Sequence, residues 1–208
     1  YGDTAAPHPV RHAPELLESS LCLGCHQAVA RVEPTLVCSF NTGVEAAEHG
    51  DGATCQSCHM PAVQRPLMPG APEREGRRHT WQGSGIPKVE GQTGLPGWTE
   101  AQAGLSASVD VPGTADPGAV VEAVISLEAS GAGHLVPTGD PERYYLLEAV
   151  ATGADGEVLG RTLYRVGQTW RWWPEAERLA DNRLAPGEQR AISLRFVLPE
   201  GGAEVEVT

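Results

Sequence analysis

Two short segments of the chain carry the same arrangement of cysteine and histidine. Residues 22–26 have the sequence C-L-G-C-H, and residues 55–59 have the sequence C-Q-S-C-H. Two thiols at this spacing can form thioethers to the two vinyl groups of one porphyrin, and the histidine that follows can then bind its iron. The chain is therefore predicted to carry two covalently bound haems c. The predicted attachment residues are Cys22, Cys25, Cys55 and Cys58, and the predicted proximal iron ligands are His26 and His59.

Paired cysteines also occur in structural zinc sites and in disulfides. A zinc ribbon usually separates its two pairs by roughly 15–20 residues, whereas 29 residues lie between Cys25 and Cys55. Neither zinc nor two disulfides explains why a histidine follows both pairs at the same offset. We therefore favour haem, with zinc and disulfides as the alternatives.

A six-coordinate electron-transfer haem needs a second axial ligand on each iron. Five histidines remain for this role. His79 lies in a polar loop beside arginines and a tryptophan, and His134 lies in a loop whose glycines allow close backbone approach to a flat plate. His8, on an extended arm, is the third candidate, whereas His12 and His49 are expected to face solvent. Ligation by two histidines predicts a lower reduction potential than ligation by histidine and methionine.

Other side chains near these histidines have predicted supporting roles. Arg77, Arg78 and Arg143 are candidates for pairing with haem propionates, because a guanidinium fork matches a carboxylate; exposed arginines are the alternative. Trp81 is expected to cover a porphyrin face. Cys38, the odd cysteine, is expected to be a small buried hydrophobe.

The elements that must position the motifs are expected to be short. A helix over residues 14–21 should lead into the first motif, and a second short helix is expected over residues 44–48. Residues 61–97 are dense in proline and glycine, so no regular element longer than a turn is expected there. Residues 1–108 are therefore predicted to form a small irregular or helical dihaem cytochrome c domain, in which loops pack on the porphyrins instead of on an ordinary core.

The rest of the chain has the alternation of β-strands. Asp155-Gly156 is expected to form a hairpin turn. The expected strands cover residues 120–127, 144–150, 158–163, 189–198 and 203–208. This rhythm predicts an all-β immunoglobulin-like sandwich over residues 109–208, with a compact barrel as the alternative.

The charge and hydropathy of the chain limit the kinds of partner and the cellular location that can be expected. The formal charge of −12 argues against nucleic-acid binding and is compatible with a cationic redox partner. No apolar run approaches the roughly 20 residues of a membrane span. Because c-type haems are attached outside the cytoplasm, the protein is expected to be exported to the periplasm or beyond the cell. We further expect that Tyr1 marks a processed terminus and that the natural chain continues beyond Thr208.

Several segments resemble a known family. Residues 55–61 resemble the C-x-S-C-H-M-P motif of multihaem cytochromes c in the nitrite reductase and hydroxylamine oxidoreductase lineage. Residues 79–83 are similar to the H-x-F/W-x-G stretch that often follows it, and residues 8–10 resemble a segment that carries a histidine ahead of such motifs. Residues 133–139 resemble the G-H-x-x-P-T-G opening of a β domain appended to some of these proteins. The chain has only two ordinary motifs and no C-x-x-C-K, so the resemblance implies haem-protein ancestry without implying either enzymatic reaction.

These observations predict an electron carrier with two closely spaced haems, ligated by histidine pairs, that exchanges electrons with redox partner proteins. A variant is a subunit of an extracellular cytochrome filament, in which a histidine such as His8 ligates a neighbour's haem. The alternatives are a haem enzyme with one open iron site, such as a peroxidase or small-molecule reductase, and a fragment of a larger multihaem cytochrome. No general acid or base is evident beside an iron, so an enzyme is the weaker prediction.

Overall fold

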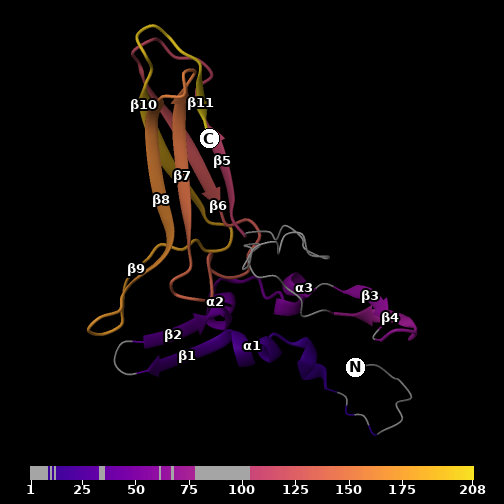
Figure 1. The fold of residues 1–208 in the computed structure, drawn as a ribbon. Coiled ribbons are helices and arrows are strands. Elements are labelled where there is room, and N and C mark those ends of the chain that lie inside the picture. Colours follow the sequence, from indigo (N-terminus) through magenta and orange to yellow (C-terminus); the bar gives the residue numbers. More distant parts are fainter. Residues whose placement is uncertain are drawn as a thin grey trace.

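The computed structural model describes residues 9, 11, 13–32, 36–60, 62–66, 68–77 and 104–208, with only the backbone described for residues 29–32 and 36–39. Figure 1 shows two tall antiparallel sheets that rise from a base of short helices and hairpins. The two cysteine motifs lie in the base. The sheets come from the carboxyl-terminal part of the chain.

The base contains short helices around both motifs. The described helical segments are η1 (Pro14–Leu17), α1 (Ser20–His26), α2 (Thr42–His49) and α3 (Cys55–His59). Pro14 begins η1, where its fixed φ and missing N–H are tolerated. Helix α1 contains the first motif, α3 contains the second, and α2 confirms the helix expected over residues 44–48.

Two hairpins in the base were not expected. Strands β1 (Gln27–Val32) and β2 (Leu36–Asn41) pair in register from Gln27↔Asn41 to Val32↔Leu36. Strands β3 (Val63–Pro66) and β4 (Glu73–Gly76) pair within the segment expected to hold nothing longer than a turn. Antiparallel pairing satisfies about half of their backbone N–H and C=O groups, and in a two-stranded hairpin the rest face outward.

The predicted fold class is therefore wrong. A small irregular or helical cytochrome domain followed by an immunoglobulin-like sandwich does not describe a chain in which strands predominate in the described residues and form several small sheets. The prediction and the structure agree only in the high content of β-strands. The division into residues 1–108 and 109–208 stays a prediction, and β5 lies across its boundary.

The tall part consists of two antiparallel sheets. One has the order β10-β6-β5, and the other has the order β11-β7-β8-β9. The strands are β5 (Ser106–Asp110), β6 (Val120–Glu128), β7 (Tyr144–Gly153), β8 (Val158–Arg171), β9 (Glu177–Asp181), β10 (Gln189–Val197) and β11 (Val205–Val207). The expected turn at Asp155-Gly156 is confirmed: Gly156 has a φ of 82°, and the Gly153 N–H donates to the Glu157 carbonyl over 2.9 Å.

The core lies between these two sheets. Strands β6 and β10 bury alternate residues, which is the periodicity that predicted them. The buried apolar residues are Val121, Ala123, Ile125, Leu127, Ala129, Val136, Ala149, Ala151, Val166, Leu184, Ile192, Leu194 and Phe196. Val136 and Leu184 belong to loops at the base end of the sheets, so the core extends to the loop that carries His134.

Truncating a core residue should lower stability strongly. Leu194 is 1% exposed. Leu194→Ala should lower the free energy of unfolding by about 2–5 kcal/mol, because the hydrophobic transfer energy of the removed atoms is lost and a cavity remains. Val197 lies on the same strand but is 55% exposed, so Val197→Ala should change stability by roughly 0.5 kcal/mol or less. Urea unfolding of both variants measures the difference; equal losses would contradict this placement of the core.

None of the helices in the described part of the chain is long and apolar enough to span a membrane.

Candidate functional site

The two cysteine motifs are held against each other by hydrogen bonds. The backbone N–H of Cys55 donates to the Ser19 hydroxyl over 3.0 Å, and the buried Gln56 side chain donates to the Glu18 carbonyl over 2.7 Å. The start of α3 therefore docks on the residues that lead into α1. Burial, and next the nearby Cys55 thiol, raise the pKa of Cys22. The first cysteines of the two motifs are thus neighbours.

The four motif cysteines form no disulfide. Cys25 and Cys58 are exposed, and Cys22 and Cys55 are partly buried. Within the described ranges, no three or more Cys, His, Asp or Glu side chains gather as a metal site. A structural zinc site needs four ligands, so the described side chains do not form one.

The second motif presents its histidine to His134. The rings of His59 and His134 are nearly parallel, with an angle of 13° between their planes and 6.1 Å between their centroids. Burial lowers the pKa of His59, and the neighbouring His134 and His26 lower it further. His134 contacts the Leu135 carbonyl through Nδ1 over 3.0 Å. When Nδ1 donates this bond, Nε2 is the nitrogen left to accept.

The centroid separation of the stacked rings matches that of a pair of axial ligands. Imidazole nitrogens bind metal ions at about 2.0–2.1 Å, so two rings on opposite sides of one ion have centroids roughly 6 Å apart. Metal-binding histidines usually donate their second nitrogen to a carbonyl or carboxylate, as His134 can do here. Direct ring contact covers about 4.5–7 Å between centroids, so the distance alone also suits stacked rings. The attachment cysteines beside His59 are what distinguish the haem interpretation.

The loop that carries His134 is fixed from two sides. Val136 and Leu184 exchange both backbone hydrogen bonds, of 2.9 and 3.1 Å. On the other side the end of α2 approaches closely, because a Cβ on Gly50 would lie 2.8 Å from the Gly133 carbonyl oxygen. Glycine at position 50 therefore allows α2 to pack against the residue before His134.

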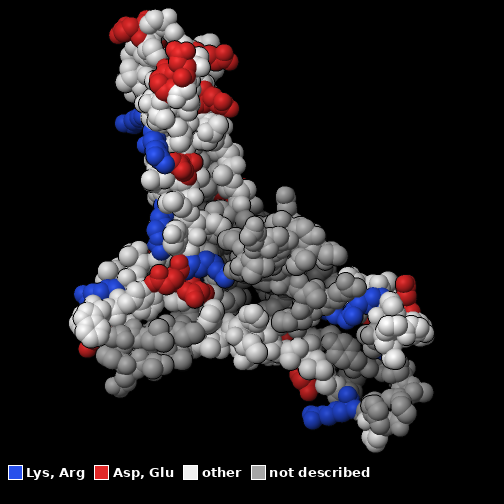
Figure 2. All heavy atoms as spheres, in the orientation of Figure 1, with Lys and Arg blue, Asp and Glu red and all other residues white. Residues whose placement is uncertain are grey.

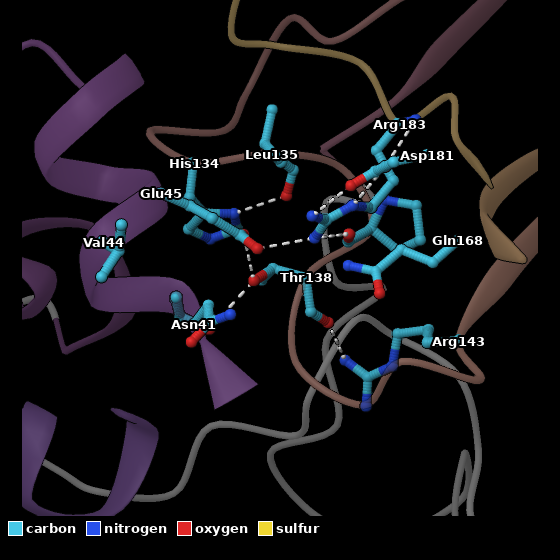
Figure 3. A network of polar contacts seen from close by, with 12 residues as sticks. Asn41, Val44, Glu45, His134, Leu135, Thr138, Arg143, Gln168, Asp181 and Arg183 are labelled. Carbon is cyan, nitrogen blue, oxygen red and sulfur yellow. Dashed lines mark hydrogen bonds and ion pairs between the residues drawn. The ribbon is translucent and has the colours of Figure 1, made fainter. Parts of the chain in front are cut away.

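A buried ionic network joins α2 to the same loop (Figure 3). Arg183 donates to Glu45 over 2.6 Å, and the side chains of both are less than a tenth exposed. The Thr138 hydroxyl donates to the second Glu45 oxygen over 2.6 Å, and Arg183 also reaches the Pro137 carbonyl over 3.3 Å. Two bonds of 2.9 Å connect Arg183 to Asp181. The network thus joins the base to the sheets.

Asp181 should make stability depend on pH. Burial alone would raise the pKa of its carboxyl, but the hydrogen bonds and charge of Arg183, helped by Arg178, outweigh burial and lower it. This contribution to stability is present above the unfolded-state pKa of about 3.9 and is lost as pH falls below it, through the folded-state pKa. Unfolding measured between about pH 5 and pH 3 should show a smaller loss of stability in Asp181→Asn than in the unaltered protein. An unchanged slope would contradict the prediction.

The arginines proposed for propionates contact backbone carbonyls. Arg77 donates to the carbonyls of Gln56 and Met60, and so holds the end of α3. Arg143 donates to the Thr138 carbonyl over 3.2 Å, in the loop that follows His134. Both lie beside the segments that carry His59 and His134, and their pairing with propionates stays a prediction.

Two more of the predicted histidines lie in the described residues. His26 ends α1, is exposed and lies near enough to His59 to lower its pKa, and His49 is exposed beside Glu48. His8, His12, His79, Arg78 and Trp81 lie outside the described residues, as does the side chain of Cys38. The structure therefore places one candidate distal ligand, His134, opposite a motif histidine.

Sequence reasoning missed Glu45, Arg183, Ser19 and Gln56. Glu45 lies in a helix whose other acidic residue, Glu48, is exposed, so its type gave no sign of burial. Its partner is 138 residues further along the chain.

Comparison of the chain with protein-family models, curated sequences and solved structures gave no match.

Proposed function

We propose that the protein is a dihaem c-type cytochrome that transfers electrons through two closely spaced haems. The observation that carries the proposal is the placement of His134, whose ring lies near-parallel to that of His59 although the two residues are 75 positions apart in the chain. His59 completes a C-x-x-C-H motif whose cysteines suit covalent attachment. A histidine pair at this spacing fits the two axial positions of one iron.

Each group in the site has an assigned role. Cys55 and Cys58 would hold the second haem, and His59 and His134 would ligate its iron; Cys22, Cys25 and His26 would hold the first. The haem supplies one-electron redox chemistry, whereas the protein supplies ligation, orientation and electrostatics. With Nδ1 donating to the Leu135 carbonyl, that bond would orient the His134 ring and leave Nε2 for ligation. Burial keeps the His59 imidazole in its neutral form, which is the form that ligates.

The neighbouring positions of Cys22 and Cys55 support close haems. Both are the first cysteine of their motif, and Ser19 bonds to both: its carbonyl accepts from the Cys22 N–H, and its hydroxyl accepts from the Cys55 N–H. These two cysteines would therefore hold the two haems close to each other. Electron exchange between them then needs no side-chain chemistry.

Partners and location are finer parts of the proposal. Covalent haem attachment implies export, to the periplasm or the cell exterior. Figure 2 shows acidic side chains gathered at the far end of the sheets, away from the base. With a net charge of −12, the protein suits a cationic redox partner. Self-association into a filament, with a ligand donated between chains, is the variant that light scattering of the haem-loaded protein tests.

The test is to count haems on the protein. Expressed in cells that attach haem c, the chain should show a Soret band and an intact mass that exceeds its amino acids by two haems. Cys22→Ser with Cys25→Ser, and separately Cys55→Ser with Cys58→Ser, should each leave one haem. Cys38→Ser, the matched control, should keep both. A colourless chain with the mass of its amino acids alone would overturn the proposal.

The resting spectrum separates a carrier from an enzyme. Two histidine pairs predict two low-spin haems in the oxidised protein that do not change on adding azide. A high-spin signal at rest would instead favour an open iron site.

A further inference from the structure

The ion pair between Glu45 and Arg183 is the most deeply buried charge contact among the described residues. Their side chains are 7% and 6% exposed, whereas an ordinary pair such as Arg195 with Glu122 is 69% and 40% exposed. Both side chains make further bonds: Glu45 accepts from Arg183 and Thr138, and Arg183 also donates to Asp181 and to the Pro137 carbonyl. Burial is thus balanced by directional bonds.

Several of those bonds end on the loop that carries His134 (Figure 3). Thr138 and Pro137 lie four and three residues after His134, and they receive one contact from each member of the pair. The Thr42 and Thr138 hydroxyls, 2.9 Å apart, add a second contact between α2 and the loop. Glu45 therefore connects the loop to α2, and Arg183 connects the same loop to the residues that follow β9.

Net stability alone does not account for this arrangement. A buried ion pair usually contributes no more stability than well-packed apolar residues of similar volume, because desolvating two charges is costly. Unlike apolar contacts, the hydrogen bonds of the pair are directional. They therefore fix the positions of the Thr138 hydroxyl and the Pro137 carbonyl in the loop. Ligating groups must be held within about 0.5 Å of their working positions by such supporting contacts.

We propose that the Glu45–Arg183 pair is a positioning device for His134, holding its loop so that the imidazole stays opposite His59. The inference rests on the proposed function, because it treats His134 as an axial ligand. It assigns Glu45 and Arg183 no contact with the haem. They act through Thr138 and Pro137, and their effect is on how firmly His134 remains in place.

The experiment is carbon monoxide binding to the reduced, haem-loaded protein. Glu45→Gln keeps the size of the side chain but removes the charge that faces Arg183. With His134 held less firmly, carbon monoxide should compete for that iron more easily, and its apparent affinity should rise roughly 5–150-fold, the usual range of coupling between sites. Added imidazole should restore the low-spin spectrum. Glu122→Gln, which alters the exposed pair, is the matched control and should bind carbon monoxide as the unaltered protein does.

Each result has a separate meaning. If the unaltered protein carries no haem, the proposed function fails. If His134→Ala opens an iron but Glu45→Gln leaves carbon monoxide affinity and the low-spin spectrum unchanged, the positioning inference alone is overturned. If Glu45→Gln does not fold, Thr138→Val decides: it removes the contacts of the Thr138 hydroxyl with Glu45 and Thr42 and leaves the ion pair intact. It should raise the affinity in the same direction, and no change would overturn the inference.

Discussion

Replacing His134 by alanine should convert one of the two haems from a low-spin to a high-spin state. The nearly parallel His59 ring, 6.1 Å away, would lose its counterpart across the iron. Electron paramagnetic resonance of the oxidised protein should show the new high-spin signal, and the reduced protein should bind one carbon monoxide per chain. The second haem should keep its spectrum, because its cysteines and His26 are untouched.

The role of His134 as a ligand can also be tested by measuring the reduction potential of the haem. His134→Met would exchange a histidine pair for histidine and methionine, which raises the potential. A rise on the order of 0.1 V is expected, within the range of about 0.8 V over which axial ligands set haem potentials. His49→Ala is the control, since His49 is exposed and lies beside Glu48. Two haems that remain low-spin in His134→Ala would show that the distal ligand is another residue.

Arg183→Met should be among the most destabilising single substitutions in the chain. It removes the guanidinium that faces Glu45 at 2.6 Å and Asp181 at 2.9 Å, and leaves a buried carboxylate without its counterion. Breaking a buried pair from one side costs about 3–5 kcal/mol. Arg195→Met removes an exposed partner of Glu122 and should cost roughly 0–1 kcal/mol.

Urea unfolding of the haem-loaded variants, followed by tryptophan fluorescence, measures both changes. A second substitution tests the mechanism: adding Glu45→Leu to Arg183→Met should recover part of the loss, because the uncompensated carboxylate is then gone. Equal losses for Arg183→Met and Arg195→Met would contradict the buried role of the pair.

Local patterns determined what the sequence could predict. The alternation of the strands depends on residues within a few positions of one another, and it placed β6, β7, β8 and β10 in the expected segments. The haem interpretation of the C-x-x-C-H segments stays a prediction. The hairpin of β1 and β2 was missed because residues 27–41 lie directly after a motif that was expected to organise irregular loops. Strands β3 and β4 were missed because proline and glycine around them suggested turns alone.

The long-range parts of the site could not be predicted in the same way. His134 was selected for the glycines and prolines around it, but nothing in the chain indicated that it would face His59. The pairing of Glu45 with Arg183 was beyond reach, since glutamate and arginine are rarely buried and their separation of 138 residues carries no periodic signal. Only the folded sheets bring these residues to α2.

The distance along the chain between His59 and His134 also sets an order of events during maturation. On the proposed function the chain is exported before haem is attached, and both cysteine motifs then leave the export channel before His134. Long-range strand pairing is slow compared with local helix formation, so haem attachment would have a period in which α3 exists and the sheets do not. The distal side of the site closes only after the last strands have paired, so the newly made cytochrome should pass through a stage that is already coloured and still reactive toward small ligands.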